Sequence, residues 1–125
     1  MNSVMYFEIQ ADDLEAAKSF YGDIFGWKFT KQEGTQIEYW SIATEGINGG
    51  LLKRPAKAPG DQMGTNAFTC SMEVADFDEV SNKIMIHGGR VALPKFAVPG
   101  KCWQGYFLDT EDNTFGIFQV DSNAK

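Results

Sequence analysis

Several features that would narrow the function are missing from this chain of 125 residues. It has no run of about 18 apolar residues, so we expect no helix that spans a bilayer. The first ten residues hold no basic segment followed by an apolar one, so we expect no signal peptide. The formal net charge of −6 argues against nucleic acid and anionic membranes as partners, because both attract basic surfaces.

Residue types that hold metals or act as nucleophiles are scarce as well. His87 is the only histidine, and it follows a predicted helix, where it can cap carbonyl groups. Cys70 and Cys102 are too far apart in the sequence for a CxxC pair. We therefore expect both to be small buried residues with reduced thiols, in a cytoplasmic protein. No G-x-G-x-x-G sequence is present to bind a phosphate.

Aromatic residues are plentiful, and the order of periodic segments is regular. Aromatics make up 14% of the chain, enough for a core or an apolar pocket. Apolar alternation and helical spacing predict strand, helix and three strands, twice. The first set comprises a strand at 4–10, a helix within 11–27 begun by Asp12 or Asp13, and strands at 27–32, 37–43 and 49–54. The second set comprises a strand at 67–74, a helix begun by Asp76, and strands at 90–94, 101–109 and 114–120.

This order predicts a single α+β domain, 1–125, made of two tandem βαβββ modules. The modules are residues 1–54 and 67–121, and residues 55–66, rich in Pro and Gly, read as a linker. An internal repeat supports the division. A shift of 63 places Asp13 on Asp76, and a shift of 66 places Trp40 on Tyr106 and Gly50 on Gly116.

Two segments carry a family resemblance. The stretch FEIQADDLEAAKSFYGDIFGWKF (7–29) closely resembles the opening module of the vicinal oxygen chelate superfamily, which includes glyoxalase I, bleomycin resistance proteins and extradiol dioxygenases. The stretch LDTEDNTFGIFQ (108–119) resembles its closing signature, and the Phe-Gly ending is similar to a short branch related to lactoylglutathione lyase. The resemblance implies strands curled into a U-shaped mixed sheet around a cavity, with helices on the outer face. It also implies a homodimer in which modules pair within a chain or by exchange between chains.

The resemblance further implies where metal ligands would stand. Metal-dependent members use one residue from each of four strands, and these positions are Tyr6, Gly50, Thr69 and Gly116 here. None is the His, Asp or Glu that first-row divalent ions need, so we expect no metal at this site and no other cofactor. The acidic segment 109–113 lacks the spacing of an EF-hand loop and predicts a turn, with Asn113 suited to the left-handed conformation.

Glu8 is the one candidate catalytic residue. Alternation places Tyr6, Glu8 and Gln10 on one strand face, and the resemblance directs that face toward the cavity. A carboxylate there can act as a general base or anchor a cationic ligand, or can simply bond neighbouring polar groups. By parity with Gly116 we expect Phe118 to face inward, whereas the side of Gln104 and Tyr106 is open. Glycine at 50 and 116 would widen the cavity floor for a flat ligand.

These observations favour a metal-free binding protein, of the bleomycin resistance type, for a small aromatic or amphipathic molecule. One alternative is a lyase or isomerase related to lactoylglutathione lyase, so whether the protein is an enzyme is open. A second alternative is an interaction or regulatory module. The candidate ligand-binding residues are Tyr6, Glu8, Gln10, Trp40, Gly50, Thr69, Tyr106, Gly116 and Phe118.

Overall fold

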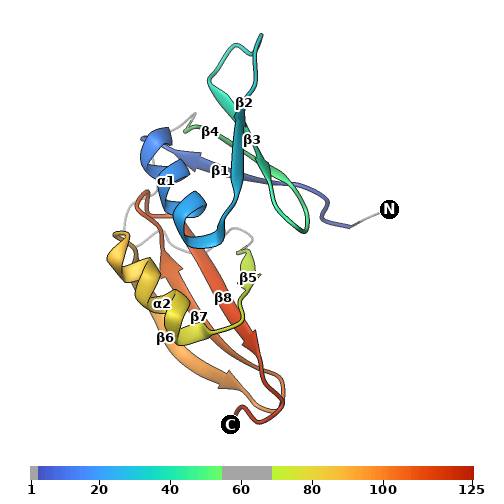
Figure 1. The fold of residues 1–125 in the computed structure, drawn as a ribbon, viewed down its shortest axis with the longest axis vertical. Helices are drawn as coiled ribbons and strands as arrows, with labels where there is room; N and C mark the ends of the chain where they lie inside the picture. The colour runs from blue at the N-terminus through green and yellow to red at the C-terminus, as the bar shows by residue number, and fades with distance from the viewer. Residues whose placement is uncertain (1–2, 55–68) are drawn as a thin grey trace. The chain divides into compact units, whose positions relative to one another are not determined.

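The computed structural model describes residues 3–54 and 69–125, so the predicted linker 55–66 lies outside the described residues. Two compact units are present, Met1–Ala58 and Pro59–Lys125. Each unit contains one helix and one four-stranded mixed sheet (Figure 1). The prediction of an α+β chain with two βαβββ modules is therefore confirmed.

The first unit runs β1 (Phe7–Ala11), α1 (Leu14–Phe25), β2 (Lys28–Lys31), β3 (Tyr39–Ala43) and β4 (Gly49–Lys53). Its strands lie in the order β1-β4-β3-β2. β1 is parallel to β4, and the other pairs are antiparallel. Helix α1 connects β1 at one edge of the sheet to β2 at the other edge, and β4 returns to pair with β1 in parallel.

The second unit repeats this topology with β5 (Ser71–Glu73), α2 (Phe77–Ile86), β6 (Arg90–Val98), β7 (Cys102–Leu108) and β8 (Thr114–Val120). Its order is β5-β8-β7-β6, again with one parallel pair, β5 and β8. β6 continues past Pro94, where the sequence predicted its end. The register shifts between Leu93 and Phe96, so the ladder passes the proline through an irregularity.

Local capping explains where α1 begins and ends. Asp13 is the N-cap, and its carboxylate accepts a hydrogen bond from the Ala16 N–H at 3.0 Å. Gly26 ends the helix in the left-handed conformation, with φ of 72°. The predicted apolar stripe packs against the sheet, and the core cluster comprises Ala11, Leu14, Ala17, Ile42 and Leu51.

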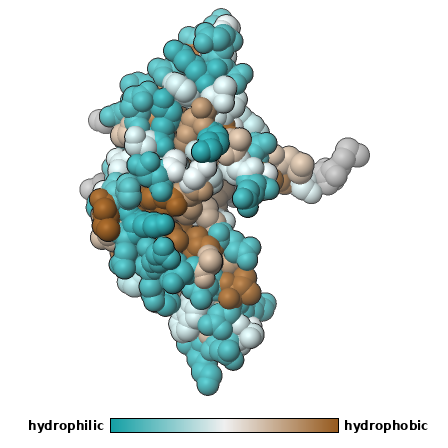
Figure 2. Space-filling model, viewed as in Figure 1, coloured by the Kyte–Doolittle hydropathy of each residue, from teal (hydrophilic) through white to brown (hydrophobic). Residues whose placement is uncertain are grey.

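Helix α2 is capped at both ends by the predicted residues. The carboxylate of Asp76 accepts from the Glu79 N–H at 3.0 Å, and His87 Nδ1 donates to the Lys83 carbonyl at 2.8 Å. Met85 and Ile86 are exposed at its end, and Figure 2 shows apolar surface over this part of α2. None of the helices in the described ranges is long and apolar enough to cross a membrane.

Each sheet therefore has one face against its helix and one face away from it, which we call the distal face. In the first unit, Leu51 and Ile42 pack with α1, so alternation puts their neighbours on the distal face. In the second unit, the ring of Phe107 lies tilted against that of Phe77 of α2, with a centroid distance of 6.2 Å. The distal faces carry Glu8, Gln10, Tyr39, Ser41, Gly50 and Leu52 in the first unit, and Ser71, Glu73, Gln104, Tyr106, Gly116 and Phe118 in the second.

Candidate functional site

Gly50 lies at the centre of the first distal face, between Glu8 of β1 and Ser41 of β3. The space that a Cβ atom would take at Gly50 is filled by the phenol of Tyr39. The hydroxyl oxygen and Cζ overlap that position, and Cε1 is 2.7 Å from it. Position 50 is therefore glycine because a side chain of the same sheet folds over it, and not because the cavity floor is open, as the sequence suggested.

Tyr39 belongs to a short chain of hydrogen bonds on this face. Its hydroxyl donates to Glu8 Oε2 at 2.8 Å, and the Tyr6 hydroxyl lies 2.7 Å from the same oxygen. Since Tyr39 has one hydroxyl hydrogen and gives it to Glu8, Tyr6 must be the donor to Tyr39. Burial, together with these bonds to Tyr6 and Glu8, raises the pKa of Tyr39 far above its ordinary value, so the phenol stays protonated.

Gly116 occupies the matching place in the second unit, between Ser71 of β5 and Tyr106 of β7. A Cβ there would overlap Ser71 Oγ and lie 2.7 Å from Gln104 Nε2. Gln104 Nε2 donates to Ser71 Oγ at 3.1 Å, directly over the glycine. The second distal face thus closes over its glycine with an amide and a hydroxyl.

The two arrangements are equivalent by strand pairing. Tyr39 lies two residues before Ser41, the antiparallel partner of Gly50, and bonds Glu8, the parallel partner of Gly50. Gln104 likewise lies two residues before Tyr106, the antiparallel partner of Gly116, and bonds Ser71, the parallel partner of Gly116. We call Tyr39–Glu8 and Gln104–Ser71 the covering pairs. The internal repeat therefore extends from the topology to a specific side-chain arrangement.

Several predicted residues share these faces. Tyr6 and Glu8 meet over Gly50, and Gln10 follows on the same side of β1. In the second unit, Tyr106 and Phe118 share the face of Gly116, which settles the side of β7 that the sequence left open. Tyr106 also stacks on Phe96 of β6 with a centroid distance of 6.4 Å.

Trp40 is not part of either group. It lies on the helix face of β3, where Lys18 Nζ is 3.3 Å from its ring centroid. The sequence repeat misplaced Trp40 because the two hairpins differ in length. Nine positions separate the paired residues Ser41 and Gly50, whereas ten separate the paired residues Tyr106 and Gly116. A single shift of 66 therefore aligned Trp40 with Tyr106 although they face opposite ways.

Thr69 also stands apart from the group on the second distal face. It is exposed and precedes β5, and Ser71 is the residue opposite Gly116.

Sequence reasoning missed Tyr39 and Ser71. They could have been found only if the strand pairing had been known. A glycine that pairs with polar residues on both neighbouring strands indicates a position that side chains can cover. Cys70 is exposed, so the prediction of a buried thiol is wrong there.

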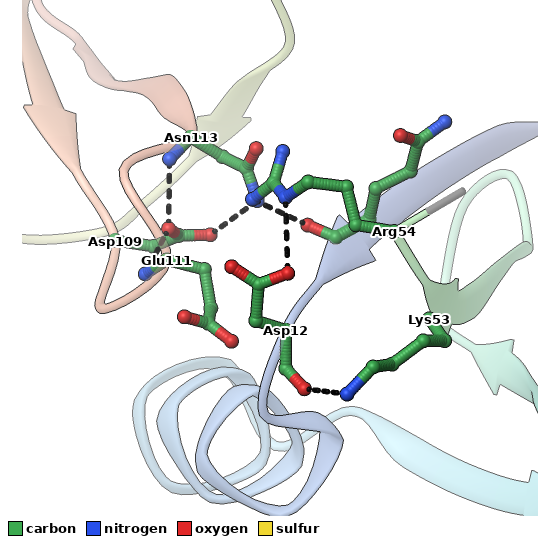
Figure 3. Close-up of polar contacts among 7 residues, drawn as sticks. Asp12, Lys53, Arg54, Asp109, Glu111 and Asn113 are labelled. Atoms are coloured by element: carbon green, nitrogen blue, oxygen red, sulfur yellow. Dashed lines mark hydrogen bonds and ion pairs between the residues drawn. The ribbon is translucent and has the colours of Figure 1, made fainter. Parts of the chain in front are cut away.

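The acidic segment after β7 is a turn stabilised by one buried carboxylate (Figure 3). Asp109 is 2% exposed, and its Oδ1 accepts from the backbone N–H groups of Glu111 at 2.8 Å and Asn113 at 2.9 Å. Its Oδ2 accepts from Asn113 Nδ2 at 3.1 Å. The residue in the left-handed region is Asp112, with φ of 62°, and not Asn113 as expected.

A second group of acidic residues surrounds the start of α1. An open depression of about 380 Å³ is lined there by Asp12, Asp13, Leu14, Glu15, Glu38 and Lys53. Lys53 Nζ donates to the Asp12 carbonyl at 2.7 Å (Figure 3). None of the residues that line it belongs to the distal face, so this depression is separate from the hydrogen bonds among Tyr6, Tyr39 and Glu8.

The positions that the resemblance assigns to metal ligands do not fit an ion. A carboxylate side chain at position 50 would need the space of the Tyr39 phenol, and one at position 116 the space of Ser71 and Gln104. In residues 3–54 and 69–125, no group of three or more His, Cys, Asp or Glu side chains is placed to hold a metal. Glu8 is the single carboxylate beside Gly50, and it already accepts from Tyr39.

Comparison with known proteins agrees with this fold. The family model described as bleomycin resistance protein-like N-terminal matches residues 3–37. CFP32 of Mycobacterium bovis, named as a candidate glyoxylase, is 28% identical over 119 residues. That alignment covers 91% of this chain but 44% of CFP32, so the chain spans less than half of that relative.

Solved structures resemble the chain along nearly its whole length. A glyoxalase/bleomycin resistance protein/dioxygenase family enzyme from Burkholderia phytofirmans has a TM-score of 0.73 and 20% identity, covering 94% of this chain and 98% of that one. The fosfomycin resistance protein FosX from Listeria monocytogenes has a TM-score of 0.78 and 13% identity, covering 97% and 93%.

At these identities the solved structures show the fold alone. The chain thus has the fold of the glyoxalase/bleomycin resistance protein/dioxygenase proteins, and its sequence is similar to a bleomycin resistance protein-like N-terminal domain over residues 3–37 and to CFP32 over most of its length.

Proposed function

We propose that the protein binds a small aromatic or amphipathic molecule on the distal face of its sheets, without a metal at the usual positions of the superfamily. The observation that carries this proposal is the covering of Gly50 and Gly116 by hydrogen-bonded side chains. Such side chains offer hydrogen-bonding anchors in the place where metal-dependent relatives would hold ligands to an ion.

The composition of the distal faces supports a small-molecule site. Tyr6 is 49% exposed and Phe96 37% exposed, and Tyr106 and Phe118 are half-buried, so aromatic surface is available beside the polar pairs. Small-molecule sites combine apolar and aromatic walls with a few polar groups that fix orientation. A homodimer remains part of the proposal, because the resemblance implies one.

The Tyr6–Tyr39–Glu8 chain favours a second candidate, a lyase or isomerase acting on a small oxygenated substrate. A carboxylate held by a tyrosine can take a proton from a bound substrate, provided that the substrate comes within hydrogen-bonding distance. The glyoxylase name of CFP32 agrees with this class, although the relative is more than twice as long as this chain. Activity that survives Glu8→Gln unchanged would remove this candidate.

A thermal-shift screen of aromatic and amphipathic compounds tests the binding proposal. We expect some compounds to raise the melting temperature, because a ligand that binds only the native state stabilises it. The rise should shrink in Tyr6→Ala or Tyr106→Ala and persist in Ile47→Ala, which removes an exposed apolar side chain from the β3–β4 turn. Silence across a broad library, or stabilisation that survives both tyrosine substitutions, would contradict the proposal.

A further inference from the structure

We propose that the Glu8 chain, defined as Tyr6, Tyr39 and Glu8, recognises a ligand through a positively charged hydrogen-bond donor, such as a primary ammonium group. This inference rests on the proposed function and names the chemical class of the ligand that the first distal face prefers. It follows from counting the hydrogen-bond donors of these three side chains.

Each tyrosine hydroxyl has one hydrogen, and both hydrogens are used in bonds among Tyr6, Tyr39 and Glu8. Tyr39 gives its hydrogen to Glu8 Oε2 at 2.8 Å, and Tyr6 gives its own to Tyr39 at 2.7 Å. A carboxylate has no hydrogen to offer. The atoms left for a ligand are therefore acceptors, namely the lone pairs of the Tyr6 oxygen and of Glu8.

The charge of Glu8 also favours a cationic group on the ligand. Among the described residues of the first distal face, the charged side chains are Glu8 of β1 and Lys28 of β2, which is the opposite edge strand. On β1, β4 and β3 the other residues of this face are uncharged: Gln10, Tyr39, Ser41, Ala43, Gly50 and Leu52. A carboxylate beside aromatic rings suits a cation, which can bond to the oxygen and lie against a ring face. The ring of Tyr6 is accessible for this, since the residue is 49% exposed.

The second covering pair lacks this selectivity. Gln104 Nε2 donates to Ser71 Oγ at 3.1 Å and to the Gly105 carbonyl at 3.4 Å, so both amide hydrogens are used. The Ser71 hydroxyl then keeps a hydrogen to donate, and the Gln104 carbonyl oxygen can accept. This neutral pair serves ligand donors and acceptors alike. Glu73 lies on the same face but is not part of the covering pair, so the covering pair that contains a carboxylate is the one in the first unit.

NMR titration of the full chain with three matched probes tests the inference. Phenethylammonium, phenethyl alcohol and 3-phenylpropanoate share a phenyl ring and a short tether but differ in charge. We expect phenethylammonium to shift the amide signals of Glu8, Tyr39 and Gly50. It should bind roughly fivefold more tightly than 3-phenylpropanoate, which is the size expected for one exposed charge pair.

Two variants assign the preference to Glu8. Glu8→Gln keeps the shape and removes the charge, and it should abolish the preference for the ammonium while changing phenethyl alcohol binding less than about twofold. Glu45→Gln makes the same change at an exposed residue between β3 and β4, outside the strands, and should leave the preference intact. An equal loss in both variants would show a general charge effect and overturn the inference.

A second measurement keeps the inference testable if Glu8→Gln fails to fold. Raising NaCl from about 0.02 to about 0.5 M should weaken phenethylammonium binding to the unmodified protein and leave phenethyl alcohol unchanged. If 3-phenylpropanoate binds the first distal face as tightly as the ammonium, the inference falls and the proposed function stands. If no probe and no library compound binds, the proposed function itself falls.

Discussion

At the scale of single residues, the feature that distinguishes this site is a glycine beneath a tyrosine hydroxyl. The overlap at Gly50 involves the far end of the Tyr39 side chain, which is free to rotate away. An added methyl group would therefore displace Tyr39 and break its bond to Glu8, while the strand itself could persist. Gly50 and Tyr39 should consequently behave as one coupled unit.

A double-mutant cycle measures that coupling. We expect Gly50→Ala to lower the free energy of unfolding by about 1 kcal/mol, the net value of a typical hydrogen bond. In a Tyr39→Ala background the same change should cost less than about 0.5 kcal/mol, because the space above Gly50 is then empty. Urea unfolding of the four proteins gives the coupling energy.

Gly46→Ala is the matched control for this cycle. A Cβ at Gly46 would meet only Thr44 Oγ1, at 3.9 Å, so this substitution should show no coupling to Tyr39. Additive effects of Gly50→Ala and Tyr39→Ala would mean that the phenol does not occupy the space above Gly50 in solution.

At the scale of elements, much of the fold could be predicted from local sequence signals. The caps Asp13 and Asp76 and the stop at Gly26 lie within a few residues of their partners, so the sequence alone places the helices. The strand at 114–120 was predicted with the bounds that the structure has. Strand β1 begins at Phe7 and not at Val4, since pairing with β4 sets its start.

The side-chain arrangement on the distal faces could not be predicted in the same way. Whether Tyr39 or Trp40 covers Gly50 depends on the register between β3 and β4, and a change of one residue exchanges the two faces. The hairpin in the second unit has one residue more between paired positions, so the repeat could not supply that register. The bond from Gln104 to Ser71 joins strands that are not neighbours in the sheet, and it is visible only in three dimensions.

The β7–β8 turn gives a prediction at this scale. Asp109→Ala would leave the backbone N–H groups of Glu111 and Asn113 without their carboxylate partner in a part-buried turn. Leaving buried donors unsatisfied costs about 1–3 kcal/mol, so we expect a loss of roughly 2 kcal/mol in the free energy of unfolding. Thermal or urea unfolding measures this loss.

Asp112→Asn is the control for the turn. Asp112 is exposed and left-handed, a conformation that Asn also tolerates, so the free energy of unfolding should change by less than about 0.5 kcal/mol. If Asp109→Ala proves as mild as this control, the carboxylate does not stabilise the turn. Calcium should not protect either variant, because the turn uses Asp109 for its own N–H groups.

At the scale of the whole molecule, the same solution appears in both units. Each has a glycine at the fourth-strand position and a side chain from the neighbouring antiparallel strand folded over it. The partners differ, a carboxylate with a phenol in one unit and a hydroxyl with an amide in the other. The two units thus share the geometry of the covering pair and differ in its chemistry.

Covering both glycines leads to a prediction about metals for the intact protein. Metal analysis after purification should find no stoichiometric Ni, Zn, Fe or Mn, and EDTA should leave the melting temperature unchanged. If an ion were bound, a concentration 100-fold above its dissociation constant would add about 2.7 kcal/mol of stability, which corresponds to roughly 10 °C for a chain of this size. We expect Ni²⁺ and Mn²⁺ to shift the melting temperature by less than about 1 °C, well below that value. A stoichiometric metal, or a shift that Glu8→Gln removes, would show that Tyr39 moves aside and that the carboxylate holds an ion.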